Sequence, residues 1–241
     1  MKFQHPLIPA TLVKRYKRFL ADVILENGDE LTVHCANPGA MHGLNAPGIK
    51  VWLSKSDNPK RKLSHSWELA EIESFGQTVL VGINTMHPNK LAMEAIEGQK
   101  IPELRGYDQL KREVPYGENS RIDILLSNEG RRDCYVEVKN VHLLRAKGLA
   151  EFPDSVTKRG TKHLNELSAM VSLGHRAVMF YVIQRDDARQ FAIAGDNDPA
   201  YASAYKAARK FGVEFIARDC TLSTSEITIS NKLVRIDPLS L

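Results

Sequence analysis

The chain has 241 residues, 43% of them hydrophobic and 26% charged, which is typical of one sizeable or two small globular domains. Its formal net charge of +4 permits an anionic partner without requiring one. No apolar run approaches the roughly 20 residues of a membrane-spanning helix, and the N-terminal segment lacks the apolar stretch of a signal peptide, so we expect a cytoplasmic protein without membrane contact. Its three widely spaced cysteines include no C-x-x-C pair and indicate neither disulfides nor a cysteine-based zinc site.

The first third of the sequence predicts short strands joined by turns. Residues 18–35 hold two β-rich segments around Asn27-Gly28, a dipeptide that favours a hairpin because both residues tolerate positive φ. Further strands are expected at 49–54, 66–73 and 77–83. Five short strands within about 85 residues favour a small barrel, and the five-stranded oligonucleotide-binding barrel fits this count.

A different pattern follows, and we expect an N-terminal domain of residues 1–85 and a C-terminal domain of residues 86–241. A helix is predicted at 84–98, where Pro88 suits an early helical position. The later elements are expected to be a weak helix at 102–110, an edge strand at 112–117, strands at 121–126 and 134–141, a helix at 156–174, a strand at 176–184, a helix at 198–212 and a strand at 213–217. Strands and helices in this order predict a mixed α/β sheet with helices on its faces.

The strand "CYVEVKNV" at 134–141 carries Glu137 and Lys139 on one face, because strand side chains alternate. Asp123 lies one short turn upstream and would lie beside Glu137 if the two strands pair. Two close carboxylates repel each other unless a cation lies between them, and oxygen ligands suit Mg²⁺ or Mn²⁺. Such an ion with Lys139 would serve phosphodiester hydrolysis. An amphipathic strand with one solvated face shows the same pattern, so both interpretations stay open.

Basic residues gather at three places that could contact a nucleic acid. The helix after "CYVEVKNV" begins with Arg159, Lys162 and His163, which could hold a phosphate backbone or form an ordinary solvated face. In the barrel, cations alternate with Tyr16 and Phe19 in the mixture that single-strand binders use. The barrel cations are Lys14, Arg15, Lys17 and Arg18, and a second group on an expected loop, Lys60, Arg61 and Lys62. No glycine-rich phosphate loop is present, so no nucleotide cofactor is expected. The histidines do not have the spacing of a zinc site.

The chain resembles the bacterial sugar fermentation stimulation protein A family along nearly its whole length. The segments that carry the resemblance are, in order, "RYKRFLADV", "CANPGAM", "NKLAMEAIE", "SRIDILL", "CYVEVKNVHL" and "FPDSVTKRGTKHLNEL". The resemblance implies an N-terminal barrel like the oligonucleotide-binding fold, a C-terminal domain of the PD-(D/E)xK nuclease-like fold, non-specific DNA binding and a link to the regulation of maltose metabolism. It assigns Asp123 to the isolated acidic position, and Glu137 with Lys139 to the E-x-K pair. A further glutamate often joins this site from the preceding helix, and Glu94 as a metal ligand or Glu113 could fill that place.

We therefore expect a DNA-binding protein with a catalytic site of Asp123, Glu137 and Lys139 and with Mg²⁺ or Mn²⁺ as its cofactor. The alternative is a non-catalytic DNA-binding regulator of sugar metabolism, since a fold does not fix an activity. Single-stranded DNA and RNA are both open as the polymer, because phosphate contacts and base stacking serve either. The sequence indicates no oligomeric state.

Overall fold

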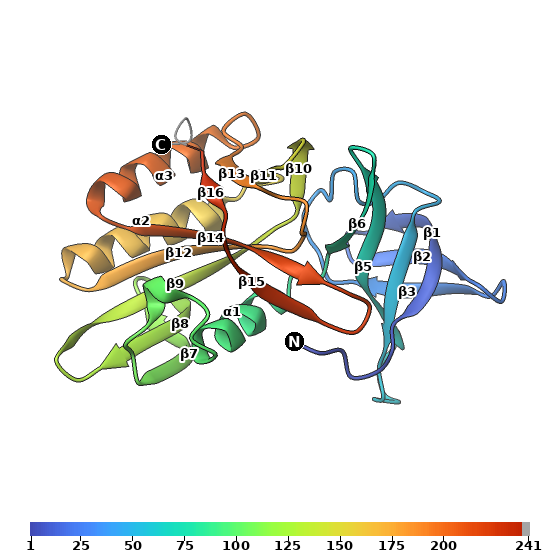
Figure 1. Cartoon of the computed structure of the whole chain (residues 1–241), viewed down its shortest axis with the longest axis horizontal. Coiled ribbons are helices and arrows are strands. Elements are labelled where there is room, and N and C mark those ends of the chain that lie inside the picture. Colours follow the sequence, from blue (N-terminus) through green and yellow to red (C-terminus); the bar gives the residue numbers. More distant parts are fainter. Residues whose placement is uncertain (238–241) are drawn as a thin grey trace.

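The computed structural model describes residues 1–237, which form an N-terminal barrel and a larger C-terminal α/β domain (Figure 1). The barrel strands are β1 (Ile8–Tyr16), β2 (Leu20–Leu25), β3 (Glu30–Cys35), β4 (Lys50–Lys55), β5 (His65–Ser74) and β6 (Gln77–Gly82). They form one sheet in the order β3-β2-β1-β4-β5-β6, and parallel pairing of β3 with β5 closes the barrel. The predicted strands are present, and the basic segment before them adds β1.

The turns of the barrel follow local backbone preferences. Gly28, between β2 and β3, has φ +90°, which a glycine adopts without a Cβ penalty. The turn between β1 and β2 instead places Lys17 and Arg18 at φ +47° and +63°. Where the barrel meets the C-terminal domain, the Gly82 N–H of β6 donates to the Gln184 carbonyl at 2.8 Å. The two domains are thus joined by backbone hydrogen bonding as well as by side-chain packing.

The C-terminal domain is built on a six-stranded sheet in the order β15-β14-β12-β9-β8-β7, in which β9, β12 and β14 run parallel. Its strands are β7 (Gln109–Tyr116), β8 (Ser120–Asn128), β9 (Arg131–Val141), β12 (Arg176–Ile183), β14 (Glu214–Leu222) and β15 (Ile227–Leu233). A smaller sheet has the order β10-β11-β13-β16, with β10 (Leu143–Ala146), β11 (Leu149–Phe152), β13 (Gln190–Ile193) and β16 (Arg235–Ile236). The predicted mixed α/β architecture is confirmed.

Three helices cover the two faces of the six-stranded sheet, α1 (His87–Glu97) on one face and α2 (Lys158–Ser172) with α3 (Pro199–Phe211) on the other (Figure 1). The local signals for α3 are confirmed, because the Asp198 side chain accepts the Tyr201 N–H at its start and Gly212 adopts φ +102° at its end. Within residues 1–237, no helix is long and apolar enough to cross a membrane.

The predicted helix at 102–110 is wrong. A single 3₁₀ turn occupies Pro102–Leu104, Gly106 then takes φ +82°, and β7 begins at Gln109. Pairing of β7 with the neighbouring β8 outweighs the weak helical pattern of this segment.

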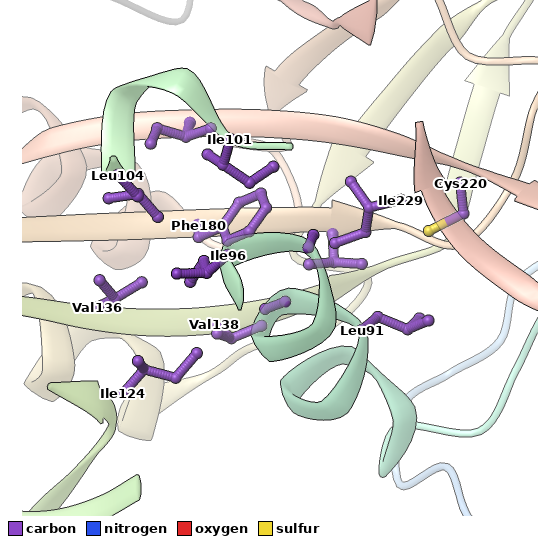
Figure 2. Packing of buried hydrophobic residues seen from close by; sticks show 14 of the residues in the cluster. Leu91, Ile96, Ile101, Leu104, Ile124, Val136, Val138, Phe180, Cys220 and Ile229 are labelled. Carbon is purple, nitrogen blue, oxygen red and sulfur yellow. The ribbon is translucent and has the colours of Figure 1, made fainter. Parts of the chain in front are cut away.

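Packing of α1 on the sheet fixes which way the β9 side chains point. Val136 and Val138 are buried in the apolar cluster beneath α1, together with Leu91 and Ile96 from the helix (Figure 2). Because side chains alternate along a strand, Glu137 and its neighbour two residues on face the opposite side, toward α2. The hydrophobic pattern of one face thus positions the charged residues on the other.

Candidate functional site

The backbone pairing of β8 with β9 ends just before Asp123 and Glu137. The register runs from Asn128↔Arg131 to Ile124↔Val136. At the next position the Asp123 carboxylate replaces a backbone acceptor, because its Oδ2 accepts the Val138 N–H at 2.8 Å. Its Oδ1 accepts from the Asn89 amide of α1 at 2.7 Å. Two strands and a helix therefore hold Asp123 in one orientation.

Glu137, Lys139 and His163 form a compact cluster between β9 and α2. Lys139 Nζ lies 2.5 Å from Glu137 Oε1 and 3.1 Å from His163 Nδ1. The Arg159 Nε donates to His163 Nε2 at 3.2 Å, which leaves the ring proton of a neutral imidazole on Nδ1. That proton points at Glu137 Oε1, with which His163 Nδ1 is in hydrogen-bond contact. The structure thus gives one oxygen of Glu137 two donors.

The pKa values of the two carboxylates are shifted in opposite directions. Burial raises the pKa of Glu137, but Lys139 and His163 outweigh burial and hold this pKa below the ordinary value, so the group is ionised. For Asp123, burial and then the charge of Glu137 raise the pKa above its ordinary value. The Val138 N–H, Lys139 and Asn89 offset these effects only in part, so a further cation nearby would stabilise the ionised form of Asp123.

Three buried oxygens of this region have no hydrogen-bond partner among the described residues: Glu137 Oε2, Glu166 Oε2 and Tyr116 Oη. Burial, followed by the charge of Glu137, raises the pKa of Tyr116, so its hydroxyl stays protonated at neutral pH. A buried, ionised carboxylate oxygen without a partner is destabilising unless a cation or water occupies its open side. Glu137 Oε2 is therefore suited to bind a hard divalent cation.

The donor set limits how such a cation could be held. In the part of the chain that the structure describes, no group of three or more His, Cys, Asp or Glu side chains is arranged around a common metal position. Asp123 and Glu137 would thus be the two carboxylate ligands, and water or substrate oxygens would complete the shell. Mg²⁺ commonly binds in this way.

Neither of the two glutamates that the sequence offers as a third acidic group lies with this pair. Glu94 forms ion pairs with the Met1 amine at 2.6 Å and with Lys90 at 3.9 Å, and no contact within residues 1–237 joins it to Asp123. Glu113 is exposed at an irregular point of β7, with φ +50°. From α1, Asn89 reaches Asp123 in place of Glu94.

The basic residues of α2 lie beside the cluster and are partly engaged. Lys162 donates to the Glu118 carbonyl at 2.7 Å and lies 3.5 Å from Glu166 Oε1. Among residues 1–237, Arg159 bonds only through its Nε, to His163, so its terminal nitrogens remain available. His163 is buried and belongs to the Glu137 cluster rather than to an exposed phosphate-binding face.

The barrel cations divide into engaged and free side chains. Arg15 donates to the carbonyls of Arg18, Asn37 and Gly39, so its guanidinium holds the barrel loops together. Two more are engaged, since Lys14 lies 3.4 Å from Asp22 and Arg61 donates to Ser66 at 2.7 Å. Those without a side-chain hydrogen bond or ion pair in the described part of the chain are Lys17, Arg18, Lys60 and Lys62.

The sequence does not identify Asn89 and Tyr116 as neighbours of the carboxylates, and its basic pattern assigns His163 to DNA contact alone. Asn89 is 34 positions from Asp123 along the chain, and His163 is 26 from Glu137. The signals that could have indicated them are the polar residue in the first turn of α1 and the spacing of Arg159 and His163 by one helical turn.

The fold defines a two-domain protein, an oligonucleotide-binding-like barrel followed by a mixed α/β domain that carries Asp123, Glu137 and Lys139. A family model described as the SfsA N-terminal OB domain matches residues 13–83, and one described as the sugar fermentation stimulation protein RE domain matches residues 86–226. The chain belongs to the sugar fermentation stimulation protein family, as its sequence motifs predict.

Curated relatives and one solved structure support this assignment over the full length. A sugar fermentation stimulation protein homolog of Azorhizobium caulinodans is 54% identical over 233 residues, 97% of this chain and 98% of the relative. A homolog of Rhodospirillum centenum is 55% identical over the same shares of both chains. Pyrococcus furiosus SfsA, whose structure was solved in complex with Ca²⁺, is 26% identical with a TM-score of 0.86, covering 98% of both chains.

Proposed function

We propose that this protein binds DNA and hydrolyses phosphodiester bonds at a metal-dependent site formed by Asp123, Glu137 and Lys139. The observation that carries the proposal is the buried Glu137 Oε2, which has no partner in residues 1–237 and lies beside a second carboxylate whose pKa is raised. A divalent cation would relieve both destabilising features. The Ca²⁺ complex of the Pyrococcus furiosus relative supports this use of the fold.

Asp123 and Glu137 would hold the ion, for which Mg²⁺ or Mn²⁺ is the proposed species. When bound, it would polarise a phosphate oxygen and lower the pKa of a coordinated water. Carboxylate ligands match both ions in hardness.

The other residues of the site act on the substrate phosphate. Lys139 has 15% of its side chain exposed, so its ammonium can reach a phosphoryl oxygen and stabilise the charge that develops there. His163 holds Glu137 from the α2 side and so positions it. Arg159 and Lys162 would bind neighbouring phosphates through their free donors.

The barrel would bind the polymer while the C-terminal domain acts on it. We place the division between the two domains at residue 85, between the end of β6 and the start of α1. The free cations Lys17, Arg18, Lys60 and Lys62 are the proposed phosphate contacts of the barrel. Lys14, Arg15 and Arg61 would contribute less, because each already has a protein partner.

One observation favours a second function, a DNA-binding regulator of sugar (maltose) metabolism that does not cleave. Lys139 and His163 both occupy Glu137 Oε1, so the charge of this carboxylate is partly compensated without a metal. In that case the cluster would stabilise the fold or a metal-supported DNA complex.

The two functions separate in a cleavage assay on the full chain. Plasmid and single-stranded DNA are incubated with Mg²⁺ or Mn²⁺ and with the wild type, Asp123→Ala and Lys139→Ala proteins. We expect metal-dependent cleavage in the wild type and a loss of at least about a hundredfold in both variants, the scale of losing a preorganised charge-stabilising group. Glu113→Gln, which changes an exposed glutamate outside the site, is the matched control. Binding without cleavage under every metal condition would exclude the nuclease and leave the regulator.

A further inference from the structure

A cleft of about 770 Å³ is lined by residues of both the barrel and the C-terminal domain. Arg18 and the loop 37–40 line it from the barrel, and the segment 152–157 lines it from the opposite domain. Asn140, at its inner wall, directly follows Lys139 in β9, and Thr157 caps the helix that carries His163. The cleft lining therefore adjoins the candidate residues along the chain, in β9 and at the start of α2.

The size of the cleft restricts its occupant. Cavities of about 300–1,000 Å³ enclose one ligand of small-molecule size. A cleft of this volume can hold a few nucleotides of one strand, whereas a double helix is too large to enter it.

Among the charged residues that line the cleft, one cation has no protein partner within residues 1–237. Asp154 is its carboxylate, and its oxygens are already bonded to the Met41 N–H at 3.2 Å, the Ser155 hydroxyl at 3.2 Å and His142 Nε2 at 3.3 Å. Arg15 is likewise engaged, by the loop carbonyls. Arg18 lines the same cleft, and its guanidinium has no hydrogen bond or ion pair within residues 1–237. An anionic group in the cleft would therefore find a donor that is not already in use.

One exposed apolar side chain lines the cleft, and two others are next to lining residues along the chain. Phe19 follows Arg18 and is 47% exposed, Met86 follows the lining residue Thr85 and is 75% exposed, and Val156 lines the cleft and is 67% exposed. Apolar surface of this kind beside free cations matches a single strand, whose base faces are open to stacking. A duplex hides those faces.

The turn that presents Arg18 is unusual for a chain reversal. Lys17 and Arg18 both take left-handed backbone conformations, which hairpin turns normally assign to Asn and Gly. Two long cationic residues occupy these positions in spite of the backbone strain, which indicates a role for their side chains.

We infer that the cleft between the barrel and the C-terminal domain binds a single polynucleotide strand, with Arg18 on its phosphates and Phe19, Met86 and Val156 against its bases. Delivery of that strand to Asp123 and Glu137 rests on the proposed function. Binding of the strand in the cleft does not, because it requires no metal and no cleavage.

Binding is measured by fluorescence anisotropy on the full chain in EDTA, where metal-dependent cleavage is absent. The probes are labelled oligo(dT), oligo(U) and a blunt DNA duplex of equal length. We expect both single strands to bind more tightly than the duplex, and the relative affinity of oligo(dT) and oligo(U) shows whether DNA or RNA is preferred. The double variant Arg18→Ala, Phe19→Ala should weaken oligo(dT) binding at least about fivefold, the smallest effect expected of losing one stacked base.

The matched control is Lys210→Ala, Phe211→Ala, which removes another cation followed by an exposed phenylalanine, at the end of α3 and outside the cleft. It should leave the affinity for oligo(dT) unchanged. Equal affinity for duplex and single strands, or equal effects of the two double variants, would overturn the assignment of the cleft. Wild-type binding with these properties but no cleavage would instead sink the nuclease function and leave the cleft assignment standing.

Discussion

Glu137 keeps an ionised carboxylate at 2% exposure, where desolvation opposes the charge. One of its oxygens has two donors and the other has none in the described residues. Such an arrangement is a poor solution for stability alone, since an apolar side chain of similar size would pack there without an uncompensated charge. Buried, ionised groups with an open oxygen are typical of functional sites.

Replacing Asp123 with asparagine should stabilise the metal-free protein. Since its folded-state pKa is raised, ionised Asp123 costs stability that is felt as the pH rises through that pKa. Asparagine removes the repulsion with Glu137 and retains an oxygen for the Val138 N–H. We expect a higher Tm at pH 7 and no further rise on addition of Mn²⁺, measured by differential scanning fluorimetry. Glu113→Gln should change neither property, and a lower Tm for Asp123→Asn would contradict the repulsion argument.

The pair of Asp154 and His142 predicts how the junction of the domains responds to acid. Burial raises the pKa of Asp154, but the hydrogen bond and charge of His142 and the Met41 N–H outweigh burial and lower it to about 2. A lowered pKa gives stability that is complete above the unfolded value of 3.8 and is lost as the pH falls toward 2. Urea unfolding should therefore show a loss of stability between these values that is smaller in Asp154→Asn. If the stability of the wild type and of Asp154→Asn changed equally with pH, the Asp154–His142 pair would not be the source of the acid sensitivity.

At the scale of elements, one side chain joins the starts of α2 and α3. Asp198 Oδ1 accepts the Tyr201 N–H at 3.0 Å and so caps α3. Its Oδ2 accepts the Thr157 N–H at 2.8 Å, and Thr157 in turn caps α2 by accepting the Gly160 N–H at 3.1 Å. The orientation of α2, and with it the position of His163, depends on this shared carboxylate.

Loss of the shared cap should weaken both helices. Asp198→Ala removes two acceptors of buried backbone donors, and each is expected to cost about 1 kcal/mol or more. For a chain of this length, that corresponds to a fall in Tm of about 4–8 °C in total. The nearby exposed Asp196→Ala is the control and should shift the Tm far less, because the interactions that it removes, chiefly an ion pair with Arg145, lie at the surface. Similar Tm values for both variants would show that Asp198 does not couple the helices.

Elements with strong local signals can be predicted from the sequence. The start and end of α3 follow from Asp198 and Gly212, and β12 follows from its unbroken apolar run. The short strands β10, β11, β13, β15 and β16 cannot, because each is defined by partners far along the chain and has little pattern of its own. The helix expected at 102–110 is wrong for the same reason, since pairing with β8 decides the structure of that segment.

Some residues of the candidate site can likewise be predicted from the sequence, and others cannot. Glu137 and Lys139 share a face because of strand alternation, a purely local rule, and Asp123 follows from a short connection between two strands. The roles of His163 and Asn89 depend on where α2 and α1 pack, which no local pattern specifies. The open oxygen of Glu137 is likewise visible only once the surrounding contacts are known.

At the scale of the whole molecule, the free cations of the barrel lie in two turns or loops, and the engaged ones lie mainly within strands. Lys17 and Arg18 form the tip between β1 and β2, and Lys60 and Lys62 follow β4. Cations at loop tips can adapt to a flexible polymer. The net charge of +4 therefore understates the local potential at these tips.

The salt dependence of DNA binding tests which cations bind phosphates. Removing one phosphate-binding cation should reduce the slope of log K against log salt by about 0.7 for a single strand. Replacing Lys17, Arg18, Lys60 and Lys62 with alanine should thus lower the slope by up to about 3. Lys14→Ala should alter it little, because Asp22 already pairs with this lysine. A slope that stays at the wild-type value in the fourfold variant would remove these tips from the binding surface.

The hydrogen bond from Gly82 to Gln184 affects what can be expressed in isolation. Cutting the chain after β6 would expose backbone groups that the C-terminal domain now pairs, and an open strand edge is a template for pairing with other chains. The barrel produced alone should therefore self-associate in proportion to its concentration. The C-terminal domain thus covers a strand edge that the barrel alone would leave open to other chains.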